Sequence, residues 1–171
     1  MSAPACTNPR AACVKLMAFD IDGVMTDGKL YYTEDGRELK AFNTLDGQGL
    51  RFLQQAGVEL AIITGRVSGA VTARAKNLDI RHLFQGVADK HACMSALLAE
   101  LRLDWSEAGY MGDDVVDLPT MQACAFSAAP DNAHPTVRAR ANFVSASRGG
   151  EGAVREVCDL ILATRQETRH D

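Results

Sequence analysis

The stretch AFDIDGVMTDG, residues 18–28, decides the fold of this protein. It continues an apolar run that begins at Val14 and ends at Phe19, and it then places Asp20 and Asp22 where a buried strand should end. Carboxylates repel one another and resist burial, so two of them at such a point need a chemical reason. Polar groups follow other strand-like runs of the chain in the same way, which makes the pair part of a pattern.

The composition is that of one globular domain. The 171 residues are 47% hydrophobic and 23% charged, which provides one core and leaves no room for a second domain. No apolar run reaches the ~18 residues needed to cross a bilayer, and residues 1–13 lack the apolar segment of a signal peptide. The five cysteines are scattered, without the spacing of a disulfide framework. We expect a soluble cytoplasmic protein with one domain over residues 14–165 and flexible residues 1–13.

The charge balance limits the possible partners. A net charge of −4 argues against nucleic acid, because binding to a phosphate backbone needs a basic stripe that the sequence lacks. We expect no membrane partner either. An anionic small molecule fits the sequence, provided that positive charge gathers locally.

Short apolar runs alternate with segments of helical spacing along the chain. The strand-like runs are 15–19, 58–63, 83–87, 108–111, 124–128 and 143–144, and the helical segments are 48–56, 68–77, 91–103, 117–123, 134–141 and 153–165. This alternation predicts an α/β protein with a Rossmann-like, three-layer α/β/α arrangement and a mainly parallel central sheet. In such sheets, ligands bind beyond the carboxyl ends of the strands.

One stretch interrupts the alternation. Residues 29–42, KLYYTEDGRELKAF, place Asp35-Gly36 between two strand-like runs, which is a strong hairpin signal. This β-hairpin insertion is too short to be a separate cap domain. Residues 148–171 are expected to form a C-terminal tail and helix whose removal leaves the core folded.

The three best strands each end in residues that can do chemistry. Asp20 and Asp22 follow the first, Thr64 follows the second, and an acidic cluster that contains Asp113 follows a later one. These groups should converge, because the carboxyl ends of parallel strands meet at one edge of the sheet. Acidic clusters repel unless a cation lies between them, and an oxygen-only ligand set points to Mg²⁺.

The same residues suit phosphoryl transfer. A carboxylate beside magnesium can attack phosphorus, and a second carboxyl group can pass protons to the leaving group and from water. Side chains alternate along an extended chain, so Asp22 lies beyond the strand end and can swing back over the site. Thr64 can hold phosphoryl oxygens, and Lys90 can neutralise the charge that develops during transfer.

Four segments in order, DIDGVMTDG, IITGR, Lys90 and GDDVVD, resemble the four motifs of the haloacid dehalogenase superfamily of phosphatases. The segments FNTLDGQGLR and GGEGAVREV are similar to those of its small, capless, tetrameric members that act on an eight-carbon sugar acid phosphate. The resemblance implies that Asp20 is the nucleophile and a magnesium ligand, that Asp22 is the general acid/base with its backbone carbonyl on the metal, and that Asp113 is the third protein ligand. It implies that Thr64 and Lys90 contact the phosphoryl group.

The resemblance also implies a substrate and an assembly. The substrate is expected to be an eight-carbon sugar acid phosphate of lipopolysaccharide precursor synthesis, with a nine-carbon sialic-type sugar acid phosphate as the alternative. The protein is expected to be a homotetramer, with a dimer left open. In such an assembly the hairpin 29–42 of one subunit and residues 148–152 of another close a neighbouring site.

A substrate with a carboxylate and a phosphate is expected to bind cationic side chains, above all the planar guanidinium group of arginine, and backbone N–H donors. The candidates, which the family pattern supports, are Arg51, Arg66, Arg74 and Lys90 with the loop residues Asn43, Thr44, Leu45, Asp46 and Gly47. Relatives carry more polar residues in this loop, and Leu45 departs from that pattern. Arg74 stands in a helical segment, where surface charge is common.

Each feature also has a simpler interpretation. Alone, the acidic pair is an ordinary turn and Lys90 a solvated lysine, while Asp114 and Asp117 can cap a helix or support the ligands. A signalling receiver module gathers similar groups but places its lysine after every acidic cluster, whereas Lys90 precedes Asp113. A non-catalytic regulatory or oligomerisation domain of the same fold is disfavoured, because every position that transfer requires holds a competent residue.

Overall fold

A six-stranded sheet forms the centre of the computed structural model, which describes residues 8–168. The strands are β1 (Leu16–Phe19), β4 (Glu59–Ile63), β5 (His82–Phe84), β6 (Ala108–Met111), β7 (Phe126–Ala129) and β8 (Phe143–Val144). Their order is β5-β4-β1-β6-β7-β8, and every neighbouring pair is parallel. The chain fills one side of β1 first and then crosses to β6 on the other, which puts a topological switch point beside β1.

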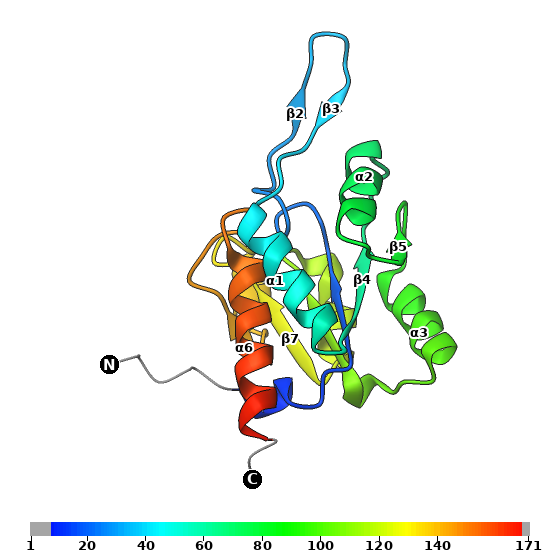
Figure 1. Ribbon diagram of the computed structural model, residues 1–171. Helices are drawn as coiled ribbons and strands as arrows, with labels where there is room; N and C mark the ends of the chain where they lie inside the picture. Colours follow the sequence, from blue (N-terminus) through cyan, green and yellow to red (C-terminus); the bar gives the residue numbers. More distant parts are fainter. Residues whose placement is uncertain (1–7, 169–171) are drawn as a thin grey trace.

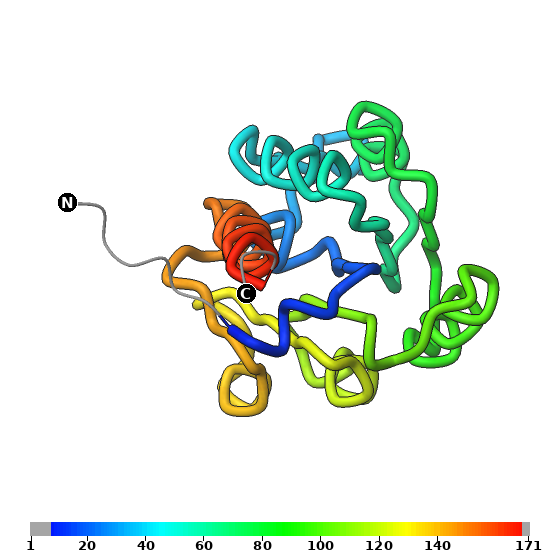
Figure 2. Tube along the Cα trace, turned by 60° about the horizontal axis from the view of Figure 1, so that its bottom comes forward, coloured from blue at the N-terminus to red at the C-terminus, as the bar shows by residue number. Residues whose placement is uncertain are grey.

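Helices cover both faces of the sheet (Figures 1 and 2). One face carries α1 (Thr44–Gln55), α2 (Gly69–Asn77) and α6 (Ala153–Glu167), and the other carries α3 (Lys90–Leu101), α4 (Leu118–Ala123) and α5 (Pro135–Arg138). Side chains alternate along β1 and so contribute to the hydrophobic cores on both faces of the sheet. Met17 and Phe19 pack on the first face, and Leu16 and Ala18 pack on the second. The predicted three-layer α/β/α fold is confirmed.

The insertion is a β-hairpin that projects from the carboxyl edge of the sheet (Figure 1). It pairs β2 (Tyr31–Tyr32) with β3 (Glu38–Leu39) in antiparallel fashion, and Gly36 takes a positive φ of 79° in the turn. Its large apolar side chains are exposed at Leu30, Tyr31, Tyr32 and Leu39. The hairpin matches the sequence prediction, and the described residues form no separate cap domain.

The two ends of the described chain bear on two expectations. Ala11, in the short helix η1 (Pro9–Ala11), is fully buried, and the backbone N–H of Asn8 donates to Thr164 Oγ1 at 3.2 Å. Residues 8–13 therefore pack against the fold at Asn8 and Ala11, while residues 1–7 lie outside the described residues. α6 buries Val157 and Ile161 completely, which argues against the expectation that residues 148–171 can be removed without unfolding the core; that expectation stays a prediction.

The remaining short helices are η2 (Trp105–Glu107) and η3 (Val115–Asp117). Within residues 8–168, none of the helices combines the length and the apolar composition that membrane crossing requires.

Candidate active site

The strand register brings the first and last motifs together. Phe19 of β1 lies opposite Ile62 of β4 and Met111 of β6. The next residue, Asp20, donates its backbone N–H to the carbonyl group of Met111 at 3.0 Å. Asp20 and Asp113 therefore stand just beyond the carboxyl ends of two neighbouring strands, where the sequence placed them.

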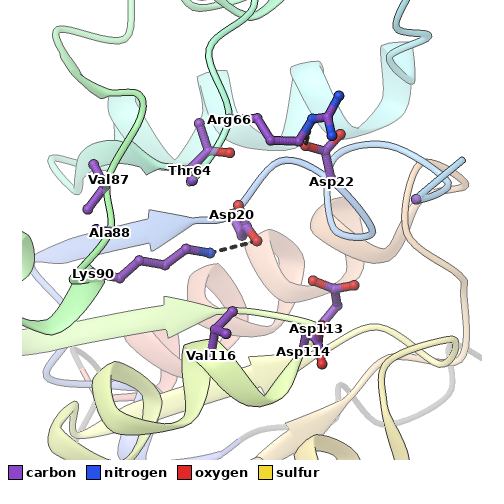
Figure 3. A pocket seen from close by; sticks show the side chains of 12 residues that line it. Asp20, Asp22, Thr64, Arg66, Val87, Ala88, Lys90, Asp113, Asp114 and Val116 are labelled. Carbon is purple, nitrogen blue, oxygen red and sulfur yellow. Dashed lines mark ion pairs between the residues drawn. The ribbon is translucent and has the colours of Figure 1, made fainter. Parts of the chain in front are cut away.

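Asp20 is a buried carboxylate held in a fixed position. It continues the face of β1 that carries Ala18, so it points toward α3 and α4. Oδ1 accepts the backbone N–H of Ile21 at 2.7 Å, and Oδ2 lies 2.8 Å from Nζ of Lys90 (Figure 3). Burial and the nearby charge of Asp117 raise the pKa of Asp20 to about 6, and Lys90 limits the rise.

Asp113 faces Asp20 across the site, and a glycine makes room for it. Gly23 has a φ of 85°, and a Cβ at this position would overlap the Asp113 carboxylate. Burial, followed by repulsion from Asp20 and Asp117, raises the pKa of Asp113 to about 7. Neighbouring carboxyl groups that resist ionisation in this way indicate a site that a cation completes.

The donor set fits magnesium. Carboxylate oxygens of Asp20, Asp113 and Asp117 lie within 4.8 Å of one another, and hard oxygen ligands of this kind suit Mg²⁺. Asp117 already accepts four hydrogen bonds, so Asp20 and Asp113 keep more free oxygen lone pairs for the ion than Asp117 does. That these two and the backbone carbonyl of Asp22 are the protein ligands stays a prediction.

Asp117 is the fully buried anchor of the site. Its Oδ1 accepts from the ammonium group of Lys90 at 2.7 Å and from the hydroxyl group of Tyr110 at 3.0 Å. Its Oδ2 accepts the backbone N–H groups of Asp113 at 3.1 Å and of Asp114 at 3.2 Å. Four donors use the acceptor capacity of this carboxylate, so Asp117 positions the lysine and the acidic loop.

Lys90 begins α3 and remains charged although it is buried. Asp89 caps this helix by accepting the backbone N–H of Ala92 at 2.9 Å, which fixes the helix start beside the site. Burial disfavours the ammonium form, but Asp20 and Asp117 outweigh that effect and raise the pKa of Lys90. A charged ammonium group therefore lies at the pocket, and its contact with a phosphoryl group stays a prediction.

Asp22 lies on the turn after β1, between two cations. Its Oδ1 contacts the ammonium group of Lys40, and its Oδ2 lies 3.7 Å from Nε of Arg66, which Figure 3 shows beside it. Glu38 of the hairpin joins both cations, at 2.8 Å from Nζ of Lys40 and 3.2 Å from Nη2 of Arg66. The sequence did not identify Lys40 or Glu38, because their meeting with Asp22 depends on where the hairpin returns to the sheet.

These groups surround a pocket of about 390 Å³, which is in the range of small-molecule sites (Figure 3). The residues that line it are Asp20, Asp22, Gly28, Thr64, Gly65, Arg66, Val87, Ala88, Lys90, Asp113, Asp114 and Val116. Every residue predicted to be catalytic or metal-binding lines this pocket. The roles assigned to them stay predictions.

The predicted substrate-binding arginines are separated by the structure. Arg66 lines the pocket, whereas Arg51 and Arg74 make contacts within the helical layer. Arg51 donates to the carbonyl group of Asn77 at 3.0 Å. Arg74 donates to the carbonyl group of Asn43 at 2.9 Å and to the side chain of Asn77 at 3.2 Å. In this chain both arginines hold the start of α1 and the end of α2.

The loop 43–47 also lies outside the pocket lining. The Asn43 side chain accepts the backbone N–H of Leu45 at 2.7 Å and caps α1, which includes Thr44. Asp46 is buried and accepts the backbone N–H of Arg155 at 2.9 Å, while a Cβ at Gly47 would overlap the side chain of Arg74. Leu45 is exposed. Substrate binding by this loop stays a prediction.

The fold and the acidic pocket define a haloacid dehalogenase-like hydrolase, and the sequence profile of these hydrolases matches residues 79–157. The chain is 45% identical over 158 residues to the 3-deoxy-D-manno-octulosonate 8-phosphate phosphatase of Yersinia pestis, which covers 92% of this chain and 84% of that protein. It is 44% identical over 153 residues to the enzyme of the same name from Escherichia coli K12, at coverages of 90% and 81%. The chain therefore belongs to the family of 3-deoxy-D-manno-octulosonate 8-phosphate phosphatases.

Solved structures agree with this assignment. The Yersinia pestis phosphatase superposes with a TM-score of 0.90 at 44% identity, covering 94% of this chain and 86% of that chain. The phosphatase from Moraxella catarrhalis, solved with a magnesium ion, a phosphate ion and 3-deoxy-D-manno-octulosonate, gives a TM-score of 0.90 at 41% identity, with coverages of 94% and 92%.

Proposed function

We propose that this protein is a Mg²⁺-dependent phosphomonoesterase that hydrolyses 3-deoxy-D-manno-octulosonate 8-phosphate to the free sugar acid and phosphate, in lipopolysaccharide precursor synthesis. One observation carries the proposal: Asp20, Asp113 and Lys90 meet in a single pocket of a chain that is 45% identical to a phosphatase of that name. The pocket supports the chemistry, and the similarity to that phosphatase supports the substrate.

The reaction begins at Asp20. A carboxylate oxygen of Asp20 attacks phosphorus, the bond between phosphorus and the sugar oxygen breaks, and Asp22 gives a proton to the departing oxygen. In the second step water attacks the aspartyl phosphate and passes a proton to Asp22 as the bond between phosphorus and Asp20 breaks. Both carboxyl groups return to their starting states.

The surrounding groups stabilise the charge. When bound, Mg²⁺ offsets the negative charge of the acidic cluster and of the phosphate, which lets the two anions approach. Lys90 stands 2.8 Å from Asp20 and offers its ammonium group to the phosphoryl oxygens. Thr64, at the end of β4, lines the same pocket and can donate its hydroxyl group.

We also propose a cytoplasmic homotetramer in which a hairpin from one subunit covers the pocket of another. The exposed apolar side chains of the hairpin support this arrangement, because solvent exposure of Leu30, Tyr31 and Leu39 is unfavourable in a lone subunit. The described cysteines are all free, which is in keeping with a reducing compartment. Sedimentation equilibrium of the wild type and of Tyr31→Ser, Leu39→Ser tests the assembly, with a shift to smaller species expected in the double variant.

Phosphate release from a panel of phosphorylated sugar acids tests the activity. We expect the eight-carbon ester to give the highest kcat/KM, and a chelator to abolish turnover until Mg²⁺ is restored. Preference for a nine-carbon sugar acid phosphate would overturn the substrate assignment. Turnover that survives complete metal removal would overturn the mechanism.

A further inference from the structure

The root of the hairpin carries a buried lysine that the mechanism above does not use. Lys40 follows β3, and only 3% of its side chain is exposed. A buried ammonium group is unfavourable unless carboxylates surround it. Lys40 meets two of them, since Nζ contacts Oδ1 of Asp22 and lies 2.8 Å from Oε1 of Glu38.

This contact is the principal restraint on Asp22. The residue lies beyond the last paired position of β1, so the sheet does not fix its side chain. Arg66 is the other cation that faces it, but Nε stays 3.7 Å from Oδ2 and 43% of the arginine side chain is exposed. Lys40 is closer and shielded, so it holds the carboxyl group more firmly.

Glu38 connects the side chain of Lys40 to the hairpin. It is the first residue of β3, pairs with Tyr32 of β2, and binds Lys40 and Arg66 through different oxygens. A movement of the hairpin therefore moves the ammonium group that Asp22 contacts. Proton transfer depends on such contacts, because a displacement of about 1 Å can cost on the order of 100-fold in rate.

We propose that Lys40 is a positioning residue that holds the Asp22 carboxyl group where it can reach the leaving oxygen, and that it links the hairpin to proton transfer. The inference rests on the proposed function and deepens it. It concerns the transfer of a proton from Asp22 to the sugar oxygen as that oxygen leaves phosphorus. That step can be separated from phosphoryl transfer by changing the leaving group.

The test compares two phosphate esters in Lys40→Met. A sugar phosphate releases a basic alkoxide that needs a proton, whereas 2,4-dinitrophenyl phosphate releases a stable phenolate that does not. The measured quantity is kcat/KM, which reports the steps up to release of the alcohol. We expect a loss of about 10- to 100-fold with 3-deoxy-D-manno-octulosonate 8-phosphate and of less than about 3-fold with the aryl ester.

Lys15→Met is the matched control. Lys15 directly precedes β1, at the end of the strand away from Asp20, 59% of its side chain is exposed, and Nζ is 2.6 Å from Glu107. Both esters should be hydrolysed at wild-type rates by this variant. Lys40→Arg, which keeps a cation and its donors, should recover part of the lost activity on the sugar phosphate.

The outcomes are distinct. Equal losses on the two esters in Lys40→Met would overturn the inference, because a general disturbance of the pocket affects both. A wild-type protein that hydrolyses neither ester with Mg²⁺ would overturn the proposed function instead. If thermal melting shows that Lys40→Met is unfolded, Glu38→Gln replaces it, and there too a loss confined to the sugar phosphate supports the link while an equal loss overturns it.

Discussion

Gly149 lies directly against the carbonyl group of Gly23, although 126 positions separate them in the sequence. The backbone N–H of Gly149 donates to Oδ1 of Asn132 at 2.6 Å, and that of Gly150 donates to the carbonyl group of Val24 at 3.1 Å. The segment before α6 therefore supports, from within the same chain, the loop that follows the first acidic pair.

Gly149→Ala should damage both stability and turnover. The new Cβ would overlap the carbonyl oxygen of Gly23, so one of the two segments must shift. We expect a destabilisation of about 1–3 kcal/mol, as in other overpacked sites, and at least a tenfold loss of kcat/KM. Thermal melting and phosphate release measure the two effects. Gly69→Ala is the control, because a Cβ there meets nothing within 4 Å, and a similar loss in it would contradict the explanation.

Asp20→Asn should abolish turnover with the fold intact. The substitution keeps the volume of the side chain but removes the nucleophilic oxygen and a charge that burial already disfavours. Circular dichroism should match the wild type while phosphate release falls below about 10⁻³ of the normal rate. Near-normal rates in this variant would show that another group attacks phosphorus.

The stability of the metal-free protein should fall as the pH rises. The pKa values of Asp20 and Asp113 increase from an ordinary 3.8 to about 6 and about 7 on folding, so between these values the folded state binds more protons than the unfolded state. The contribution of this proton binding to the free energy of unfolding is fully present below about pH 4 and is lost as the pH rises through 6 and 7. Melting of chelator-treated protein from pH 5 to pH 8 measures this loss.

Magnesium should reverse that trend, because the ion binds ionised carboxylates. We expect the stabilisation by Mg²⁺ to be larger at pH 8 than at pH 5. In Asp20→Asn both the pH-dependent loss and the magnesium effect should shrink. A magnesium effect that is the same at all pH values would count against these two carboxyl groups as ligands.

Asp117→Asn should destabilise the protein and impair catalysis together. The amide presents N–H groups where the carboxylate accepts four donors, which leaves buried donors without partners at a cost of about 1–3 kcal/mol. Urea unfolding measures the change, and Asp114→Asn serves as the control because Asp114 is exposed. Equal stability of the two variants would refute the anchoring role of Asp117.

Two truncated chains should show that folding depends on α6. A chain ending at residue 147 lacks α6 and should not fold, since Val157 and Ile161 fill the core between α1 and the sheet. A chain ending at residue 168 keeps α6 and should melt like the full protein. Cooperative melting of the shorter chain near the wild-type temperature would contradict the role of α6.

Local patterns made most of the fold predictable. The strand at 108–111 and the acidic cluster after it follow from a short apolar run and its polar end, and the structure places both as expected. The start of α1 was predicted near residue 48 but lies at Thr44, because the Asn43 side chain caps the helix earlier than the apolar spacing indicates.

Contacts between distant segments were not predictable from these patterns. The pairing of Lys40 with Asp22 depends on the path of the hairpin. The direction of Arg74 depends on how α2 packs beside Asn43, a relation that no local spacing encodes. The sequence therefore indicates which groups the pocket gathers, but the positions of the cations around Asp22 require the fold.

The alternation of side chains along β1 fixes the number of residues that must precede Asp20. Ala18 and Asp20 share one face, so adding or deleting a single residue before Asp20 would turn its carboxyl group toward the opposite layer of helices. The tip of the hairpin is not bound by this alternation within one subunit, because a Cβ at Gly36 would meet nothing within 4 Å, although the φ of 79° favours glycine there. A change of length in β1 would therefore remove the nucleophile from the pocket, whereas a change at the hairpin tip would leave the position of Asp20 unaltered.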